Sequence, residues 1–420
     1  MRKVLSKENQ VTNSEQMVLA IQQQDLDVAD QAFQAALEQD EPEMLMELAQ
    51  YLESIGFYPQ AKQIYQQEVE QFPEAYLSLA SITAEDGDLE EAFAYLEEIQ
   101  PDSDWYLNSL LVKADLYQLE GLADVAREKL AEAANLSDES LITFGLAEID
   151  FELGNFQTAI KEYASLDNRA IYEQTGVSTY QRIGVAYASL GKFEVAIDFL
   201  EKAIELEYDD TTVFELATLL YDQEEYQKAN IYFKQLDTIS PDFEGYELVY
   251  AHSLHAEHLT EQALEMTQKG LAKNPFDSQL LLFASQLSYE LHDEEGAERY
   301  LLDARDKAED LEEIALRLTN LYLEQERFDE VLNFEADQVD NVLTKWNIAR
   351  SYQALENLEK ALEIYQDLQK YLKDNPEFLE QYIYLLRELG QFEVARHQAQ
   401  HYLNLVPDDA AMQDLLDSLQ

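Results

Sequence analysis

The sequence predicts an all-α solenoid of about twelve helix-turn-helix repeats. Three observations support this fold class. Small residues, nearly all of them alanine, recur at intervals close to 34 residues along the chain. Leu, Ala, Glu and Gln are abundant, and these residues favour helices. Only 12 Gly and 8 Pro occur among 420 residues, which are too few for a loop-rich β fold.

One small residue on the second helix of each repeat serves as an anchor for the register. The interval between anchors ranges from 30 residues (331 to 361) to 37 residues (159 to 196). Unrelated amphipathic helices would not show such a nearly constant spacing of small residues, so the anchors indicate one repeated structural unit. The anchors are Ala29, Ala61, Ala92, Ala126, Ala159, Ala196, Ala229, Ala263, Ala297, Val331, Ala361 and Ala395.

The residues around each anchor define the two helices, and residues 177–210 show the pattern best. Gly184, twelve positions before the anchor, lets two helices approach closely. Gly191, five positions before it, can take the left-handed conformation that ends a helix. Leu200, four positions after it, fills the space on the same helix face. Each repeat is therefore predicted to form two antiparallel helices of about a dozen residues.

Two kinds of departure from the pattern carry information. The 37-residue interval predicts an insertion within 167–178, and the 30-residue interval follows a repeat whose second helix looks short. We expect the stacking to change pitch at about 165–180 and 333–345. Glycine is missing from the turns of the seventh to eleventh repeats, so looser turns are expected at Glu224, His258, His292, Glu326 and Glu356.

This pattern resembles the tetratricopeptide repeat family, whose period is about 34 residues. The resemblance extends over nearly all of residues 10–410, and in the best repeat it rests on Tyr180, Ile183, Gly184, Tyr187, Gly191, Phe193, Ala196, Leu200 and Ala203. It implies a right-handed superhelical solenoid whose first helices line a concave groove. The acidic, cysteine-free and Tyr-rich character also resembles cytosolic tetratricopeptide repeat proteins of low-GC Gram-positive bacteria.

We expect one continuous solenoid, because neither irregular place is rich in Pro, Gly or Ser. Its expected parts are an N-terminal tail (1–9), an N-terminal array (10–170), a central array (171–335), C-terminal repeats (336–409) and a capping helix (410–420).

The chain is strongly acidic, with 28 basic and 86 acidic residues and a net charge of −58. From Glu8 to Val112 there are 23 acids and one base, Lys62. Nucleic acid and anionic membrane surfaces are therefore excluded as partners, whereas basic partners are attracted. The chain has no cysteine, and no signal peptide or membrane span is recognisable, so a cytoplasmic location is expected.

No motif indicates an enzyme. The phosphate-binding glycine loops and the GxSxG nucleophile elbow do not occur, and paired carboxylates are uninformative among 86 acids. His252, His255 and His258 form a cluster that can bind a metal or respond to pH, but plain exposed histidines explain it better. We therefore expect no catalytic residues, no metal and no cofactor.

The groove is the expected functional surface. The resemblance to the tetratricopeptide repeat family implies that the residues fifteen, eleven and eight positions before each anchor line the groove. Aromatic residues at a binding surface often contribute most of the binding energy. The expected ligand-binding residues are Phe144, Phe151, Phe214, Tyr221, His252, Tyr289, Asn320, Trp346, Asn347, Arg350 and Tyr384. Some family members clamp a chaperone's C-terminal carboxylate. Asn320 and Asn347 match the two asparagine positions of this carboxylate clamp. The positions where the clamp has cationic residues hold Leu316, Glu377 and Gln381 in this chain, so we reject a carboxylate clamp here.

The sequence thus predicts a non-enzymatic scaffold or adaptor that binds a basic, or mixed basic and aromatic, protein or peptide segment. An intracellular receptor for a short signalling peptide is the alternative. Such receptors carry an output domain, and repeats that begin near residue 10 leave no room for one. Turnover of a metabolite by the purified protein would instead indicate an enzyme.

Overall fold

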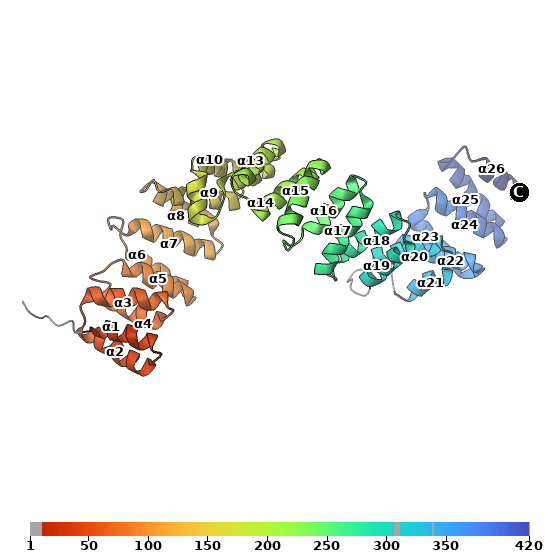
Figure 1. Ribbon diagram of the computed structural model, residues 1–420. Helices are drawn as coiled ribbons and strands as arrows, with labels where there is room; N and C mark the ends of the chain where they lie inside the picture. Colours follow the sequence, from red (N-terminus) through yellow and green to blue (C-terminus); the bar gives the residue numbers. More distant parts are fainter. Residues whose placement is uncertain (1–10, 306–310, 338–339, 420) are drawn as a thin grey trace, which may run out of the picture. The chain divides into compact units, whose positions relative to one another are not determined.

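The computed structural model describes residues 11–305, 311–337 and 340–419 (Figure 1). These residues form 26 α-helices and one 3₁₀ helix, with no strand among them. Two compact units divide the chain between Thr212 and Val213. The expected N-terminal tail, residues 1–9, lies outside the described residues.

The first unit consists of helix pairs that pack in chain order (Figure 1). Its helices are α1 (Asn13–Gln22), α2 (Leu26–Gln39), α3 (Pro42–Ser54), α4 (Tyr58–Glu68), α5 (Ala75–Glu85), α6 (Leu89–Glu97), α7 (Tyr106–Leu119), α8 (Ala123–Ala134), α9 (Ser140–Glu152), α10 (Phe156–Ala164), α11 (Asn168–Thr175), α12 (Thr179–Ser189) and α13 (Phe193–Leu206). Helix α14 (Asp210–Asp222) includes the residues at which the units divide.

The second unit repeats the arrangement and ends with a single helix. Its further helices are α15 (Tyr226–Ile239), α16 (Tyr246–Ala256), α17 (Thr260–Lys273), α18 (Ser278–Glu290), α19 (Glu294–Arg305), α20 (Glu312–Glu324), α21 (Phe328–Leu332), η1 (Asn333–Asp337), α22 (Val342–Ala354), α23 (Leu358–Leu372), α24 (Pro376–Glu388), α25 (Phe392–Leu405) and α26 (Ala410–Ser418).

The anchor residues lie in the core, as predicted. Ala196 is fully buried, and it faces the helix crossing at Gly184. A Cβ atom at Gly184 would lie 2.7 Å from Cγ of Leu200 and 3.2 Å from the carbonyl oxygen of Ala196. The close approach of α12 to α13 therefore requires glycine at this position.

The turns without glycine have the same backbone geometry as the glycine turns. Gly191 has φ of 71°, and Glu356 at the equivalent position has φ of 61°. The same left-handed conformation occurs at Glu224, His258, His292 and Glu326, with φ between 56° and 63°. This finding contradicts the expectation of looser turns: packing of the two helices fixes the turn, and the non-glycine residues adopt a strained conformation.

Both predicted irregularities are present. The insertion forms the extra helix α11, which Asp167 caps and which ends at Gly176 with φ of 73°. The second helix of the tenth repeat is short, because α21 has 5 residues and continues only as the 3₁₀ helix η1. The helix expected at the C-terminal end is α26, and Arg396 of α25 donates to the carbonyl oxygen of Leu419 just beyond it.

A pair of carboxyl groups, Asp150 and the half-buried Glu162, lies between α8, α9 and α10 in the first unit. Asp150 is fully buried and accepts hydrogen bonds from Arg127 (2.7 and 2.8 Å) and Asn155 (2.8 Å). Burial opposes its ionisation, but these donors outweigh that effect and lower its pKa. Burial and the charge of Asp150 together raise the pKa of Glu162 to about 7.

Candidate peptide-binding groove

Hydrogen bonds between equivalent positions of consecutive repeats join the first helices of the second unit. Tyr289 on α18 donates its hydroxyl to Glu324 on α20 at 2.6 Å, and His255 Nε2 on α16 lies 2.7 Å from Glu290 on α18. Both bonds link the position eight before one anchor to the position seven before the next. The bonds fix α16, α18 and α20 side by side along one face.

A second set of hydrogen bonds joins the first helices of neighbouring repeats, with one example in each unit. Asn347 on α22 donates to Asn320 Oδ1 at 2.7 Å and to Thr319 Oγ1 at 3.0 Å. In the first unit, Arg182 makes two bonds to Glu148 at 2.9 and 3.0 Å. Both pairs connect the position fourteen before an anchor to the position eleven before the preceding anchor. At these places, side-chain bonds between the first helices align one repeat with the next.

A cavity of about 310 Å³ opens between α18 and α20 and reaches down to α19. Ala297, Leu301 and Leu321 give it an apolar floor, which suits an apolar side chain. Its other lining residues are largely polar and carry the groups that can hydrogen-bond a ligand backbone: Ser285, Gln286, Tyr289, Arg317, Asn320 and Glu324.

Charged groups at the rim are partly satisfied within the chain. Arg317 pairs with Glu313 at 2.7 Å. The hydrogen bond to Glu324 raises the pKa of Tyr289, so its hydroxyl stays protonated. Burial disfavours the charge of Glu290, but hydrogen bonds from Gln286 and His255 outweigh it and lower the pKa of Glu290. Glu290 lies next to the cavity lining, and the lining itself offers the guanidinium of Arg317, the carboxylate of Glu324 and the amides of Gln286 and Asn320 around an apolar floor.

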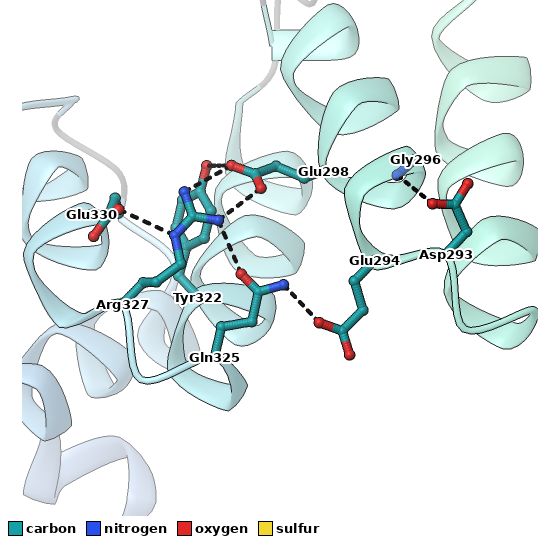
Figure 2. A network of polar contacts seen from close by, with 8 residues as sticks. All are labelled: Asp293, Glu294, Gly296, Glu298, Tyr322, Gln325, Arg327 and Glu330. Atoms are coloured by element: carbon teal, nitrogen blue, oxygen red, sulfur yellow. Dashed lines mark hydrogen bonds and ion pairs between the residues drawn. The ribbon is translucent and has the colours of Figure 1, made fainter.

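A polar network joins α19, α20 and α21 (Figure 2). Arg327, at the start of α21, donates to Glu298 of α19 at 2.7 and 2.9 Å, and Tyr322 of α20 donates to the same carboxylate at 3.0 Å. Gln325 accepts from Arg327 at 2.9 Å and donates to Glu294 at 2.8 Å. Figure 2 shows these side chains converging from α19, α20 and α21. The network fixes α19 against α20, and these two helices supply the cavity floor.

The predicted residues differ in how far they reach the groove surface. Tyr289 and Asn320 line the cavity, and Tyr289 is 45% exposed. Trp346 is only 6% exposed, and its indole N–H donates to Gln381 at 3.1 Å. Asn347 is buried as well, with its amide bonded within the array. Trp346 and Asn347 are therefore packed within the array in this structure, and direct ligand contact by them stays a prediction.

The other predicted aromatic and basic residues lie outside the cavity. Most are half-buried against rings of their own or the neighbouring repeat. Phe144 packs on Tyr163, Phe151 on Phe156, Phe214 on Phe243, Tyr221 on Tyr226, and His252 on Phe283 at 3.9 Å between ring centroids.

Arg350 on α22 and Tyr384 on α24 follow α20 in the chain. The Arg350 guanidinium lies 5.8 Å from the Trp346 ring centroid, and Tyr384 is 38% exposed. Burial and, to a smaller extent, the neighbouring His255 lower the pKa of His252, which favours the neutral imidazole. Ligand binding by this wider set of residues stays a prediction.

The sequence interpretation missed Arg317, Glu324 and the floor residue Leu301. Arg317 and Glu324 occupy the positions fourteen and seven before the anchor, which the three groove offsets did not include. Adding those two offsets would have found them. Leu301 belongs to the second helix, and only the packing of the three helices shows that it reaches the cavity.

In residues 11–305, 311–337 and 340–419, no group of three His, Asp or Glu side chains is placed to hold a metal ion. None of the helices described there has the length and apolar character needed to cross a bilayer.

Family profiles match four stretches of the chain, and all describe tetratricopeptide repeats. Two describe tetratricopeptide repeats in general and match residues 46–106 and 177–210. Together with the repeated helix pairs, these matches show that the chain belongs to the tetratricopeptide repeat family. The other two are described as YpiA-like and match residues 118–171 and, as C-terminal repeats, 343–409.

A curated relative agrees with the YpiA-like matches. The chain is similar to the TPR repeat-containing protein YpiA of Bacillus subtilis (strain 168), with 27% identity over 310 residues and 72% of each chain covered. The resemblance to proteins of low-GC Gram-positive bacteria is thereby confirmed.

Solved structures resemble the chain in fold. The C-terminal part of a repeat protein from Cytophaga hutchinsonii matches with a TM-score of 0.48 and 18% identity, covering 57% of this chain and 97% of that one. A chain of the Cut9–Hcn1 hetero-tetramer of the APC/C matches with a TM-score of 0.36 and 15% identity, covering 99% and 96%. These values support no inference about function.

Proposed function

We propose that the chain is a non-enzymatic interaction scaffold that binds an extended protein or peptide segment along the first helices of its second unit. Repeat solenoids in general use extended concave surfaces for binding. The cavity between α18 and α20 carries the proposal, because it combines an apolar floor with amide and carboxylate groups at its rim. A cytoplasmic location is part of the proposal.

The ligand that suits this site is a segment with an apolar or aromatic side chain next to a basic one. The apolar side chain enters the cavity over Leu301 and Leu321. The backbone of the segment bonds to the amides of Gln286 and Asn320, and a Lys or Arg approaches Glu324 at the rim. The net charge of −58 attracts such a ligand over a longer range.

The first experiment selects peptides from a random phage-displayed library on the full chain. Recovered peptides are labelled, and their affinity is measured by fluorescence anisotropy. Asn320→Ala and Tyr289→Ala should each weaken binding about tenfold, the usual loss for an interface residue of moderate importance. Gln366→Ala, a matched change of an exposed residue on α23, should leave the affinity unchanged.

Circular dichroism of each variant separates loss of binding from loss of fold. Equal affinity of the Asn320→Ala, Tyr289→Ala and Gln366→Ala variants would refute this site. Selection of peptides that lack a basic residue would refute the expected ligand chemistry but leave the scaffold function standing.

A further inference from the structure

The first unit contains a site where two carboxyl groups lie beside a single arginine. Asp150 on α9 is fully buried, and its two oxygens accept hydrogen bonds from Nε of Arg127 on α8 at 2.7 Å and from Nη2 at 2.8 Å. Asn155 donates to the same carboxylate at 2.8 Å. Asp150 is therefore well supplied with donors as an anion, and Arg127 balances its charge.

Glu162 on α10 is the second carboxyl group, and it lacks such donors. Its Oε2 atom is buried and has no hydrogen-bond partner in the part of the chain that the structure describes. Asp150 is its charged neighbour, and two nitrogens of Arg127 are already bound to Asp150. An ionised Glu162 would therefore place a second negative charge beside Asp150 without a cation of its own.

The other charged groups on the helices packed against α10 do not relieve this conflict. Arg182 is the one charged residue of α12, and it makes two hydrogen bonds to Glu148 of α9. Glu148 also accepts the hydroxyl of Tyr163, which follows Glu162 on α10. Glu152, the remaining acid near the end of α9, is exposed. The charges that act on Glu162 are thus those of Asp150 and Arg127.

A proton on Glu162 removes the conflict. The protonated side chain is neutral and can donate its hydroxyl to Asp150, so its buried oxygen gains a partner. Burial and the charge of Asp150 accordingly raise the pKa of Glu162 to about 7. The first unit contains no histidine, because all six lie at residue 252 or later. Glu162 is therefore the side chain through which this unit can respond to pH near neutrality.

We propose that Asp150 and Glu162 form a proton-dependent joint between the fourth and fifth repeats of the solenoid. With the proton in place, Glu162 donates to Asp150 and holds α10 against α8 and α9. When the proton is lost to water, the two carboxylates repel each other and α10 separates from α9 more readily. Tyr163 of α10 and Arg182 of α12 meet at Glu148, so loosening of α10 also weakens the alignment with α12.

The test is amide hydrogen exchange of the full chain at pH 6 and pH 8, read by mass spectrometry and corrected for the intrinsic pH dependence of exchange. The packed α10 holds the proton of Glu162 more tightly than the opened segment does, so its protection should decrease as the pH rises. A decrease of about three- to tenfold is expected in the wild type. Protection of α3 and α4, at the N-terminal end of the same unit, should stay constant.

Glu162→Gln is the decisive variant, because its amide can donate to Asp150 at every pH. Protection of α10 in this variant should match that of the wild type at pH 6 and should not change with pH. Glu152→Gln removes an exposed acid from α9 and is the matched control, which should keep the pH dependence of the wild type. Circular dichroism checks that both variants fold. Both should bind peptide between α18 and α20 like the wild type, so the proposed function is tested separately.

Carbon-13 NMR of the carboxyl groups gives an independent readout. One glutamate resonance of the wild type should titrate near pH 7, well above the ordinary range, and it should be absent from Glu162→Gln. The proposal would be overturned if no carboxyl resonance titrated above pH 6, or if the pH dependence of α10 survived in Glu162→Gln. An equal loss of protection in α3 and α4 would also overturn it, because that result would indicate repulsion throughout the acidic chain.

Discussion

Glu356→Gly should stabilise the second unit, although it removes a side chain. Glu356 has φ of 61°, and the left-handed conformation costs a non-glycine residue about 1–2 kcal/mol. Glycine is more flexible in the unfolded chain, which costs about 0.4–1 kcal/mol. The difference is a net gain of about 0.5–1 kcal/mol.

The assay is urea unfolding of the full chain followed by circular dichroism, with amide hydrogen exchange in α22 and α23 to read the local free energy. Glu363→Gly is the matched control, because it makes the same substitution at an exposed position inside α23. This control should destabilise by about 1 kcal/mol. The two variants therefore make the same Glu-to-Gly substitution, and their expected changes in the free energy of unfolding have opposite signs.

Other turns with a non-glycine residue at positive φ extend the prediction. His292→Gly and Glu326→Gly should each give a similar gain, and their effects should add, because the sites lie a repeat apart. A loss of stability in Glu356→Gly as large as that in Glu363→Gly would refute the reasoning. It would mean that the side chain at the turn contributes more than its backbone conformation costs.

Three further changes test the packing. Gly184→Ala should cost about 1–3 kcal/mol in urea unfolding, because its Cβ would overlap Leu200, and a cost near zero would contradict the close approach. Arg327→Ala should cost about 2–3 kcal/mol by the same measurement, since Glu298 loses its charged donor, and an unchanged midpoint would contradict the network. The pKa of Glu162 is raised from 4.5 to about 7, so the folded state holds the proton more tightly and stability falls as pH rises through that window. Glu162→Gln should abolish this fall and gain about 1–2 kcal/mol at alkaline pH, whereas an unaltered pH profile would contradict it.

The helix pairs could be predicted from the sequence because their determinants are local. An alanine at each anchor and a small residue twelve positions earlier mark the helix crossing, as at Ala196 and Gly184. The position of the insertion could be predicted as well, since it lengthens the anchor interval to 37 residues, but its helical conformation as α11 was not predicted. The left-handed turns at non-glycine residues were predicted less well. The intrinsic conformational preference of a residue such as Glu356 is against positive φ, and tertiary packing overrides that preference.

The candidate site could be predicted only in part. The distance in sequence between a residue and the anchor indicates on which face of the helix its side chain lies. It does not indicate how deeply neighbouring side chains cover that side chain. Trp346 and Tyr289 both occupy groove offsets, yet Trp346 is 6% exposed and Tyr289 is 45% exposed. The cavity itself depends on side chains from three helices, including Leu301, and a single helix pattern contains no information about such a space.

The contact order of this fold has a consequence for synthesis. Every pair of helices with extensive contact lies within two places of each other in chain order, in the part of the chain that the structure describes. The partners of each helix therefore emerge from the ribosome within about one repeat of it. A nascent chain of this kind can fold from its N-terminal end while translation continues. At any moment the nascent chain exposes the apolar face of only its newest repeat. Aggregation is therefore limited even before synthesis of the chain is complete.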